Sequence, residues 1–346
     1  MNNTLPYMSD IVGNDALKNR LCKDILSNTL SHAYILEGAQ GSGKHTVSLL
    51  TAAAFSCENK HKDGFSIPCA ECASCKKILS FKSPDVIFVN SGGKASLGVD
   101  VARFLKEDVY TLPNDLEHKF YIIEEADKMT HQAQNAILLT LEEPPSFVHF
   151  FLLCSNSQSL LETIRSRAPT FKTEIISTTD IDKYIQSKSD KARQMKLSST
   201  AEYRELLKAS RGSIGKALSL LEEKSWSSTF ELISFVKSIV NCATRARDAK
   251  DILELFLSFS NKRDILIEQL SMICDAIRDL IMLKKSENVS LGFYCDENEA
   301  IEICDRVSLS FLFSFQEAVY TAIDELQRNS NIKLTLTKMA VCAKLI

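Results

Sequence analysis

The stretch from Gly38 to Thr46, "GAQGSGKHT", restricts the possible folds of this chain most strongly. It fits the phosphate-loop pattern G-x-x-x-x-G-K-[ST] at Gly38, Gly43 and Lys44, but His45 stands where the pattern requires serine or threonine. The apolar "HAYILEG" before it is typical of a buried strand, and "KHTVSLLTAAAF" after it is typical of a helix. Strand, glycine loop and helix are the context that the motif requires, so a phosphate-binding α/β domain is favoured over an ordinary glycine-rich turn.

The loop predicts a nucleotide site that has lost part of its metal chemistry. Three glycines are expected to let backbone N–H groups face a phosphate: Gly38, Gly41 and Gly43. Lys44 would reach the β- and γ-phosphates. His45 replaces the hydroxyl that normally binds Mg²⁺, and imidazole is a poor ligand for this ion. Thr46 completes the candidate nucleotide-binding residues, but it lies about 100° further round the helix and points elsewhere.

A second apolar strand is predicted at residues 120–123, within "HKFYIIEEADKMT", and it ends in Glu124 and Glu125. An apolar strand that ends in acids resembles a Walker-B arrangement, in which the first acid supports Mg²⁺ and the second polarises the attacking water. Glu124 replaces the usual aspartate, so its carboxylate is one methylene further along. By itself the pair would be a surface acidic turn, but together with the loop it favours a degenerate Walker B.

Four of the eleven cysteines are clustered in the sequence: Cys57, Cys69, Cys72 and Cys75. Two overlapping C-x-x-C steps bring the thiolates of Cys69, Cys72 and Cys75 within reach of one ion. The 11-residue segment before them allows Cys57 to reach the same ion. The spacing predicts a tetrahedral Zn²⁺ site. Disulfides are the alternative, disfavoured in a reducing cytoplasm, and an iron–sulfur cluster is a more remote one. Four protein ligands leave no open position, so the predicted zinc is structural.

Composition points to a multi-domain protein of the cytoplasm. The chain has 346 residues, 45% apolar and 25% charged, with no apolar run of 18 residues and no secretory signal in "MNNTLPYMSD". Most glycines and prolines precede residue 170, and amphipathic helices such as "DILELFLSFSNKRDILIEQLSMICDAIRDLIMLKK" follow. An α/β part and then an all-helical part are therefore predicted.

The charge pattern argues against a stand-alone DNA-binding protein. The net charge is −3, and the basic residues at positions 183–211 are interleaved with acids, as on a solvated helical face. We expect no membrane partner either, because no segment is long and apolar enough to span a bilayer.

Several motifs in order resemble the bacterial clamp-loader AAA+ ATPases of the DNA polymerase III holoenzyme. They are "IVGNDALKNRL", "SHAYILEG" with its loop, "YIIEEADKMT", "NAILLTLEEPP" and "TIRSRA". The resemblance covers residues 10 to about 220 and fades to a helical pattern beyond, where "DELQRNSNIKLTLTKMAVCAKL" is similar to the last collar helix of the family.

The resemblance implies a three-part architecture. A RecA-like AAA+ P-loop domain is expected at residues 1–172, with an inserted zinc module at 57–75. A small helical lid domain is expected at 173–225 and an all-α collar domain at 226–346. It also implies a hetero-pentameric ring with gamma/tau and delta subunits that loads the sliding clamp onto primed DNA.

Within that family, the pattern favours the delta-prime type over the hydrolysing gamma/tau type. The family's arginine-finger motif falls at Arg167, followed by Ala168, and implies that this arginine acts on a neighbour's ATP. The sensor-2 arginine is replaced by Gly215, and sensor 1 falls at Ser155 or Asn156. The alternative role for Arg167 is a cap on helix-end carbonyls.

The resemblance therefore implies that the chain's own ATPase, with Glu125 as its degenerate Walker-B residue, is absent or weak. ATP or ADP binding would likewise be weak or absent. A catalytically active gamma/tau-type ATPase and a scaffold without nucleotide are the alternatives.

Overall fold

The computed structural model describes most of the chain. The described ranges are 7–60, 66–92, 96–245, 259–286 and 291–342. Residues 1–6 of the N-terminal stretch, 61–65 of the zinc module, 251–258 of the expected helical run and 343–346 lie outside them.

The chain forms two compact units. The first comprises Met1–Tyr184 with Gly212–Lys216, and the second Ile185–Arg211 with Ala217–Ile346. The first is mixed α/β and the second is helical, so the predicted change of class along the chain is confirmed. The boundaries expected at 172 and 225 stay predictions.

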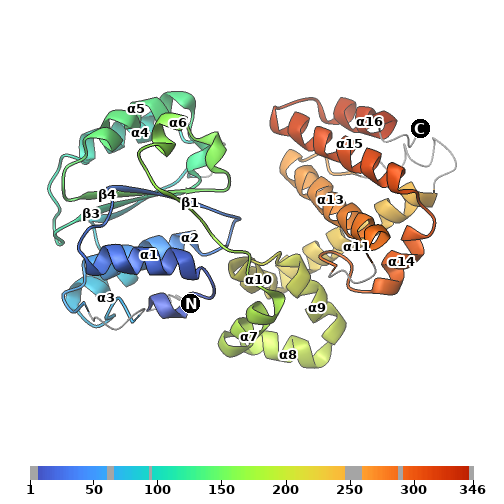
Figure 1. Ribbon diagram of the computed structural model, residues 1–346, viewed down its shortest axis with the longest axis horizontal. Helices are drawn as coiled ribbons and strands as arrows, with labels where there is room; N and C mark the ends of the chain where they lie inside the picture. The colour runs from blue at the N-terminus through green and yellow to red at the C-terminus, as the bar shows by residue number, and fades with distance from the viewer. Residues whose placement is uncertain (1–6, 61–65, 93–95, 246–258, 287–290, 343–346) are drawn as a thin grey trace. The chain divides into compact units, whose positions relative to one another are not determined.

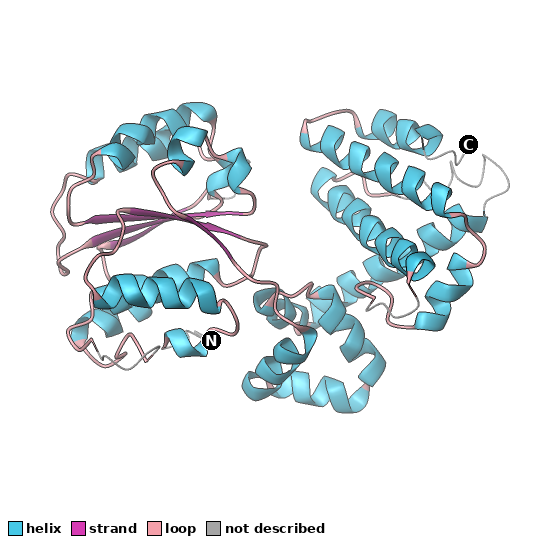
Figure 2. Ribbon diagram, viewed as in Figure 1, coloured by secondary structure: helices cyan, strands magenta, loops and turns pink. Residues whose placement is uncertain are grey.

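A parallel sheet in the order β2-β3-β4-β1-β5 forms the centre of the first unit (Figure 2). Its strands are β1 (Ala33–Glu37), β2 (Val86–Val89), β3 (Lys119–Ile123), β4 (Val148–Cys154) and β5 (Thr170–Lys172). In the register, Leu36 lies beside Leu153 and Ile123 beside Leu152. Because β3 and β4 are buried along their whole length, they read as continuous apolar runs rather than as alternating patterns.

Helices cover both faces of this sheet (Figure 1). Tyr34 and Leu36 of β1 face one core, and Ala33 and Ile35 face the other. The first core is covered by α1 (Asp15–Leu26), α2 (Lys44–Phe55) and α3 (Ala73–Leu79). The second is covered by α4 (Val99–Asp108), α5 (His131–Glu142) and α6 (Glu162–Arg165). The connecting 3-10 turns are η1 (Met8–Asp10), η2 (Ala126–Lys128) and η3 (Ser157–Ser159).

The second unit is built from helices around its own apolar core. They are α8 (Asp190–Ser198), α9 (Thr200–Ala209), α11 (Glu223–Arg245), α13 (Arg263–Lys285), α14 (Glu297–Cys304), α15 (Leu309–Gln327) and α16 (Ile332–Cys342). Two more, α7 (Thr178–Lys188) and α10 (Ile214–Leu220), each contain a point where the chain passes from one unit to the other, and a third such point lies between Arg211 and Gly212. The core includes Leu270 and Ile277 of α13 and Phe315 of α15.

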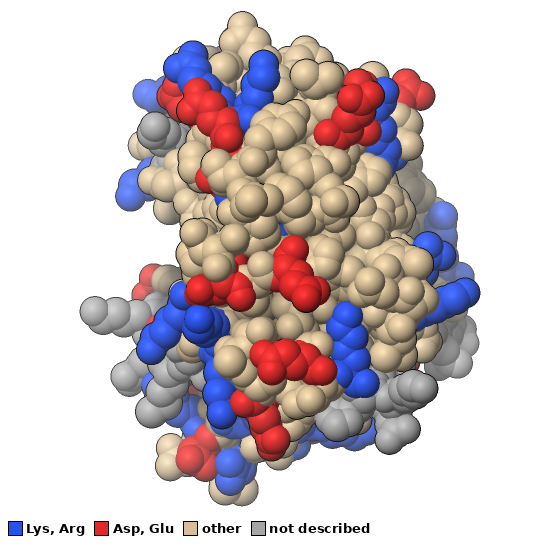
Figure 3. All heavy atoms as spheres, turned by 90° about the vertical axis from the view of Figure 1, so that its left-hand side faces the viewer, with Lys and Arg blue, Asp and Glu red and all other residues tan. Residues whose placement is uncertain are grey.

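None of the helices in the described ranges has the length and apolar character needed to cross a bilayer. On the side drawn in Figure 3, Lys and Arg side chains are interspersed with Asp and Glu and separated by uncharged areas. This side therefore offers no continuous basic surface to a nucleic acid backbone.

Candidate functional site

The predicted nucleotide residues meet at one edge of the sheet. The carboxyl ends of parallel strands lie at the same edge, and the glycine loop, Glu124 and Ser155 directly follow β1, β3 and β4. His45 Nε2 lies 3.2 Å from Glu124 Oε1, and the Ser155 N–H donates at 3.0 Å to Oδ2 of Asp127, a residue that the sequence did not single out. This is the edge where ligands bind in open α/β sheets.

The loop has the backbone that its glycines predict. Gly41 and Gly43 have φ values of 75° and 91°, in the left-handed region, and Gly43 caps α2, which begins at Lys44. At Gly38 a Cβ would lie 1.8 Å from Thr173 Oγ1, whereas at Gly43 it would meet nothing within 4 Å. The loop is thus packed at its start and open at its end.

The Lys44 side chain lies over the loop. Its Nζ donates to the carbonyl oxygens of Gly38 and Ala39, at 2.5 and 2.8 Å. Burial lowers the pKa of Lys44, while the nearby Cys154 and Asp127 act in the opposite direction. The predicted phosphate-binding cation therefore lies at the loop.

His45 and Glu124, the two residues that the sequence predicts near a metal position, contact each other. Besides the contact with Glu124, the imidazole stacks on Phe88 and Phe81, with ring centroids 4.9 and 6.0 Å away. Burial lowers the pKa of His45 and Glu124 raises it, with burial the larger effect. Among the described residues the Thr46 hydroxyl takes part in no hydrogen bond. The His45–Glu124 pair, with two phenylalanine rings stacked on its imidazole, thus occupies the position where the sequence predicted metal support.

Glu125, the predicted second acid, is engaged elsewhere. Its φ is 50°, and its carboxylate pairs with Lys128 Nζ at 2.7 Å and accepts from Ser91 Oγ at 3.4 Å. Its carboxylate is therefore held by side chains outside the glycine loop.

Residues 213–216 lie directly on the loop. The Ser213 hydroxyl donates to the carbonyl of Gln40, and the Gly215 N–H donates to the carbonyl of Gly41, both at 3.1 Å. A Cβ on Gly215 would lie 2.9 Å from both the Cα and the carbonyl oxygen of Gly41. The predicted sensor-2 position therefore has no room for a side chain.

Several other contacts at this edge were not marked by any pattern in the sequence. Asp127 faces Lys44 and accepts from Ser155, although only its position shortly after Glu125 marked it. The Ser157 hydroxyl donates to Glu37 Oε2 at 2.5 Å, and this bond, opposed by burial, lowers the pKa of Glu37. Neither contact has a pattern that could have been recognised along the chain.

Arg167 lies just after α6 and is partly exposed. Its Nη2 pairs with Glu142 Oε1 at 2.6 Å, and its Nη1 donates to the Thr163 carbonyl at 2.7 Å. The cap on a helix-end carbonyl, which the sequence left as an alternative, is therefore present. The side chain is 34% exposed, so a cap and an outward contact are compatible.

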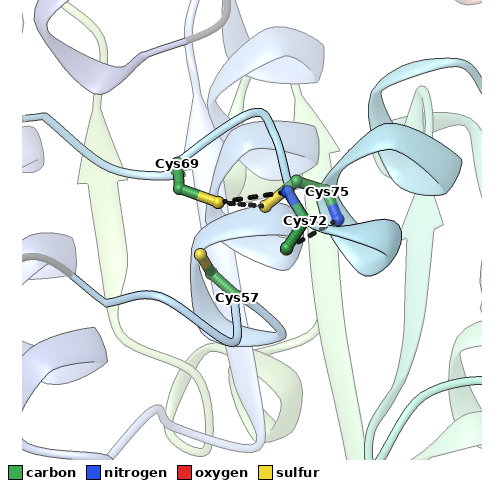
Figure 4. Close-up of side chains that lie close together, drawn as sticks. All are labelled: Cys57, Cys69, Cys72 and Cys75. Carbon is green, nitrogen blue, oxygen red and sulfur yellow. Dashed lines mark hydrogen bonds between the residues drawn. The ribbon is translucent and has the colours of Figure 1, made fainter.

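The four clustered cysteines converge as predicted (Figure 4). Their sulfurs all lie within 4.8 Å of one another, and all four thiols are free. A tetrahedral zinc with Zn–S bonds of about 2.3 Å places its sulfurs about 3.8 Å apart. The sulfurs of Cys69 and Cys75 are 3.9 Å apart. No disulfide joins these four cysteines in the structure, and the cluster could hold a metal ion such as zinc.

Backbone N–H groups donate to two of these sulfurs. Cys72 N–H donates to Cys69 Sγ and Cys75 N–H to Cys72 Sγ, both at 3.4 Å. Burial raises the pKa of Cys69, but N–H groups of Cys72 and Glu71 outweigh it and the pKa falls to about 6. The cluster also fixes the end of α2, because Cys57 follows that helix and Cys75 Sγ contacts the Ala53 carbonyl at 3.6 Å.

Comparisons with known proteins agree with these features. Residues 13–176 match the family model described as DNA polymerase III, delta subunit. The chain is 26% identical to the DNA polymerase III gamma subunit of Buchnera aphidicola, over 82% of this chain and 73% of that protein. It is 32% identical to the tau subunit of Bacillus subtilis, over 62% of this chain and 37% of tau.

Relatives of the other subunit type match as well. The chain is 35% identical to the delta' subunit of B. subtilis, over 49% of this chain and 47% of delta'. The matches to both B. subtilis proteins thus span less than half of their lengths. A Thermotoga maritima gamma subunit-related structure aligns at 18% identity over 94% of this chain and 98% of its own, with a TM-score of 0.46. The chain is thus similar to the gamma/tau and delta' subunits of DNA polymerase III.

Proposed function

We propose that this chain is a delta-prime-type clamp-loader subunit. In this proposal its own nucleotide site does not hydrolyse ATP, and Arg167 acts on the nucleotide of a neighbouring subunit. The observation that carries the proposal is the 3.2 Å contact between His45 and Glu124.

The contact matters because both side chains stand where a hydrolysing site holds Mg²⁺. Magnesium requires octahedral oxygen coordination at about 2.0–2.1 Å and dehydrates reluctantly. For a metal to enter, the Glu124 carboxylate would have to leave the His45 imidazole. Even then, the imidazole would offer the metal no oxygen ligand. Mg²⁺ binding is therefore disfavoured both because imidazole is a poor ligand for it and because Glu124 is already paired with His45.

Phosphate contacts are better preserved than metal contacts. Lys44 and the loop N–H groups remain, and the space beside Gly43 is open. The segment at Gly215 supplies no cation and lies against Gly41. We infer a site that binds ATP or ADP weakly or not at all, and with little dependence on Mg²⁺.

In this proposal the chain works within a hetero-pentamer with gamma/tau and delta subunits in the cytoplasm. The complex loads the sliding clamp onto primed DNA, and zinc at the four cysteines serves the structure. A gamma/tau-type ATPase is the second candidate, favoured by the intact Lys44 and by the gamma and tau relatives.

Equilibrium binding of ATP to the purified chain, with and without Mg²⁺, tests the state of the site. We expect affinities within about threefold of each other, a difference below 1 kcal/mol. A gain of more than about tenfold with Mg²⁺ would support the gamma/tau-type candidate instead. A Lys44→Ala variant controls for binding outside the loop.

The trans role of Arg167 is tested separately in the reconstituted complex. Arg167→Ala should leave assembly intact and lower the DNA-stimulated ATPase. Arginine fingers are worth about 10³ to 10⁵ in rate in well-studied cases. An unchanged ATPase would show that Arg167 only caps the helix and has no trans role.

A further inference from the structure

Glu142 makes the one ion pair that the described residues offer to Arg167. The carboxylate lies at the last residue of α5, and its Oε1 is 2.6 Å from Arg167 Nη2. The other terminal nitrogen, Nη1, donates to the Thr163 carbonyl at 2.7 Å. The guanidinium is thus held on two sides by groups of its own chain.

The backbone that carries Arg167 is also fixed. Ile164 and Ala168, on either side of it, are 0% and 2% exposed within the core beneath α5. The preceding segment is tied to α5 by Gln134, whose amide donates to the Ser159 carbonyl and accepts from the Leu161 N–H. The root of the side chain is therefore rigid, and its orientation depends on contacts at the tip.

The tip keeps donors for a further partner. A guanidinium has five N–H donors in one plane, and each terminal nitrogen carries two of them. Glu142 engages Nη2, whereas the Thr163 carbonyl and the Ser166 hydroxyl engage Nη1, so Nη2 retains a second N–H, and the Nε–H has no partner among the described residues. With the side chain 34% exposed, these donors are available to an oxyanion brought by another molecule.

We propose that Glu142 is a positioning residue for Arg167, orienting its guanidinium toward the phosphate oxygens of a nucleotide held by a neighbouring subunit. This inference rests on the proposed trans role of Arg167. A half-exposed ion pair contributes little to stability, so the contact is best explained by orientation. Misplacing a catalytic group by about 1 Å can cost about 100-fold in rate.

The test uses a reconstituted complex in which only the neighbour facing Arg167 keeps its phosphate-loop lysine. Glu142→Ala should lower kcat for ATP about 10- to 100-fold and leave KM nearly unchanged, because orientation acts on the transition state. Glu142→Gln should retain most of the rate, since its amide oxygen can still accept from Nη2. Glu143→Ala is the matched control, because the Glu143 carboxylate forms no ion pair within the described part of the chain.

The double variant Glu142→Ala/Arg167→Ala separates positioning from other effects. It should be no slower than Arg167→Ala alone. A further loss in the double variant, or a wild-type kcat in Glu142→Ala beside a slow Arg167→Ala, would overturn the positioning role and leave the proposed function standing. If Arg167→Ala keeps the wild-type kcat, both the positioning role of Glu142 and the proposed trans role of Arg167 are refuted.

Discussion

The contact between Gly215 and Gly41 predicts a measurable cost for the smallest possible side chain. In Gly215→Ala the new Cβ would lie 2.9 Å from the Cα and the carbonyl oxygen of Gly41 and 3.3 Å from its carbonyl carbon. All three are backbone atoms, in a turn where Gly41 has a φ of 75°, so no side-chain rotation can relieve the overlap. Overpacking of this kind costs about 1–3 kcal/mol.

The overlap can be relieved in two ways, and both are observable. Either the first unit loses stability, at about 2–4 °C in Tm per kcal/mol for a unit of this size, or residues 213–216 lift from the loop. In the second case the Gly215 N–H loses its bond to the Gly41 carbonyl and its hydrogen exchange accelerates. Thermal unfolding and amide exchange of the full chain distinguish the two.

Gly98→Ala is the control for this experiment. Gly98 has an ordinary φ of −86°, and a Cβ there would meet nothing within 4 Å. The reasoning is refuted if Gly215→Ala matches Gly98→Ala in both Tm and the exchange of the Gly215 amide. Gly215→Arg, which introduces the arginine that the sequence resemblance implies at this position, should likewise disturb the loop and produce no ATPase.

Three further predictions concern the metal, the pH dependence and the loop histidine. Purified, reduced protein should contain about one zinc per chain, and Cys72→Ser should release it while most of the fold survives; metal analysis without zinc in wild-type protein contradicts this. Burial lowers the pKa of His149 to about 4, so the stability from its neutral form is complete above about pH 6.5 and is lost as the pH falls toward 4. The change is on the order of 3 kcal/mol, and urea unfolding of His149→Gln should lack it; an identical pH dependence in both proteins refutes the assignment. His45→Thr alone should not restore turnover, because Glu124 and Gly215 remain, and ATPase assays of this variant check it.

Local patterns predicted the elements of the α/β unit well. The predicted loop-to-helix boundary is confirmed, since α2 begins at Lys44 directly after the left-handed Gly43. The two apolar runs became β3 and β4 because both are buried on both faces. The cysteine spacing predicted a cluster, and the sulfurs converge. In each case one short segment carries the physical cause.

Contacts between distant segments were beyond such patterns. Gly41 and Gly215 are far apart in the sequence, and an isolated glycine does not indicate which backbone it approaches. The pairing of His45 with Glu124 depends on two rotamers at the ends of separate elements. The same holds for Glu142 and Arg167, whose contact follows from the way α6 packs beside α5.

The most direct test of the central claim is ATP hydrolysis by the isolated, zinc-loaded chain, measured with and without Mg²⁺ beside the Lys44→Ala variant. The account predicts that wild-type protein and variant hydrolyse ATP equally slowly, at the background rate, in both conditions. Hydrolysis that requires both Mg²⁺ and Lys44 would contradict a non-hydrolysing site and favour a gamma/tau-type ATPase.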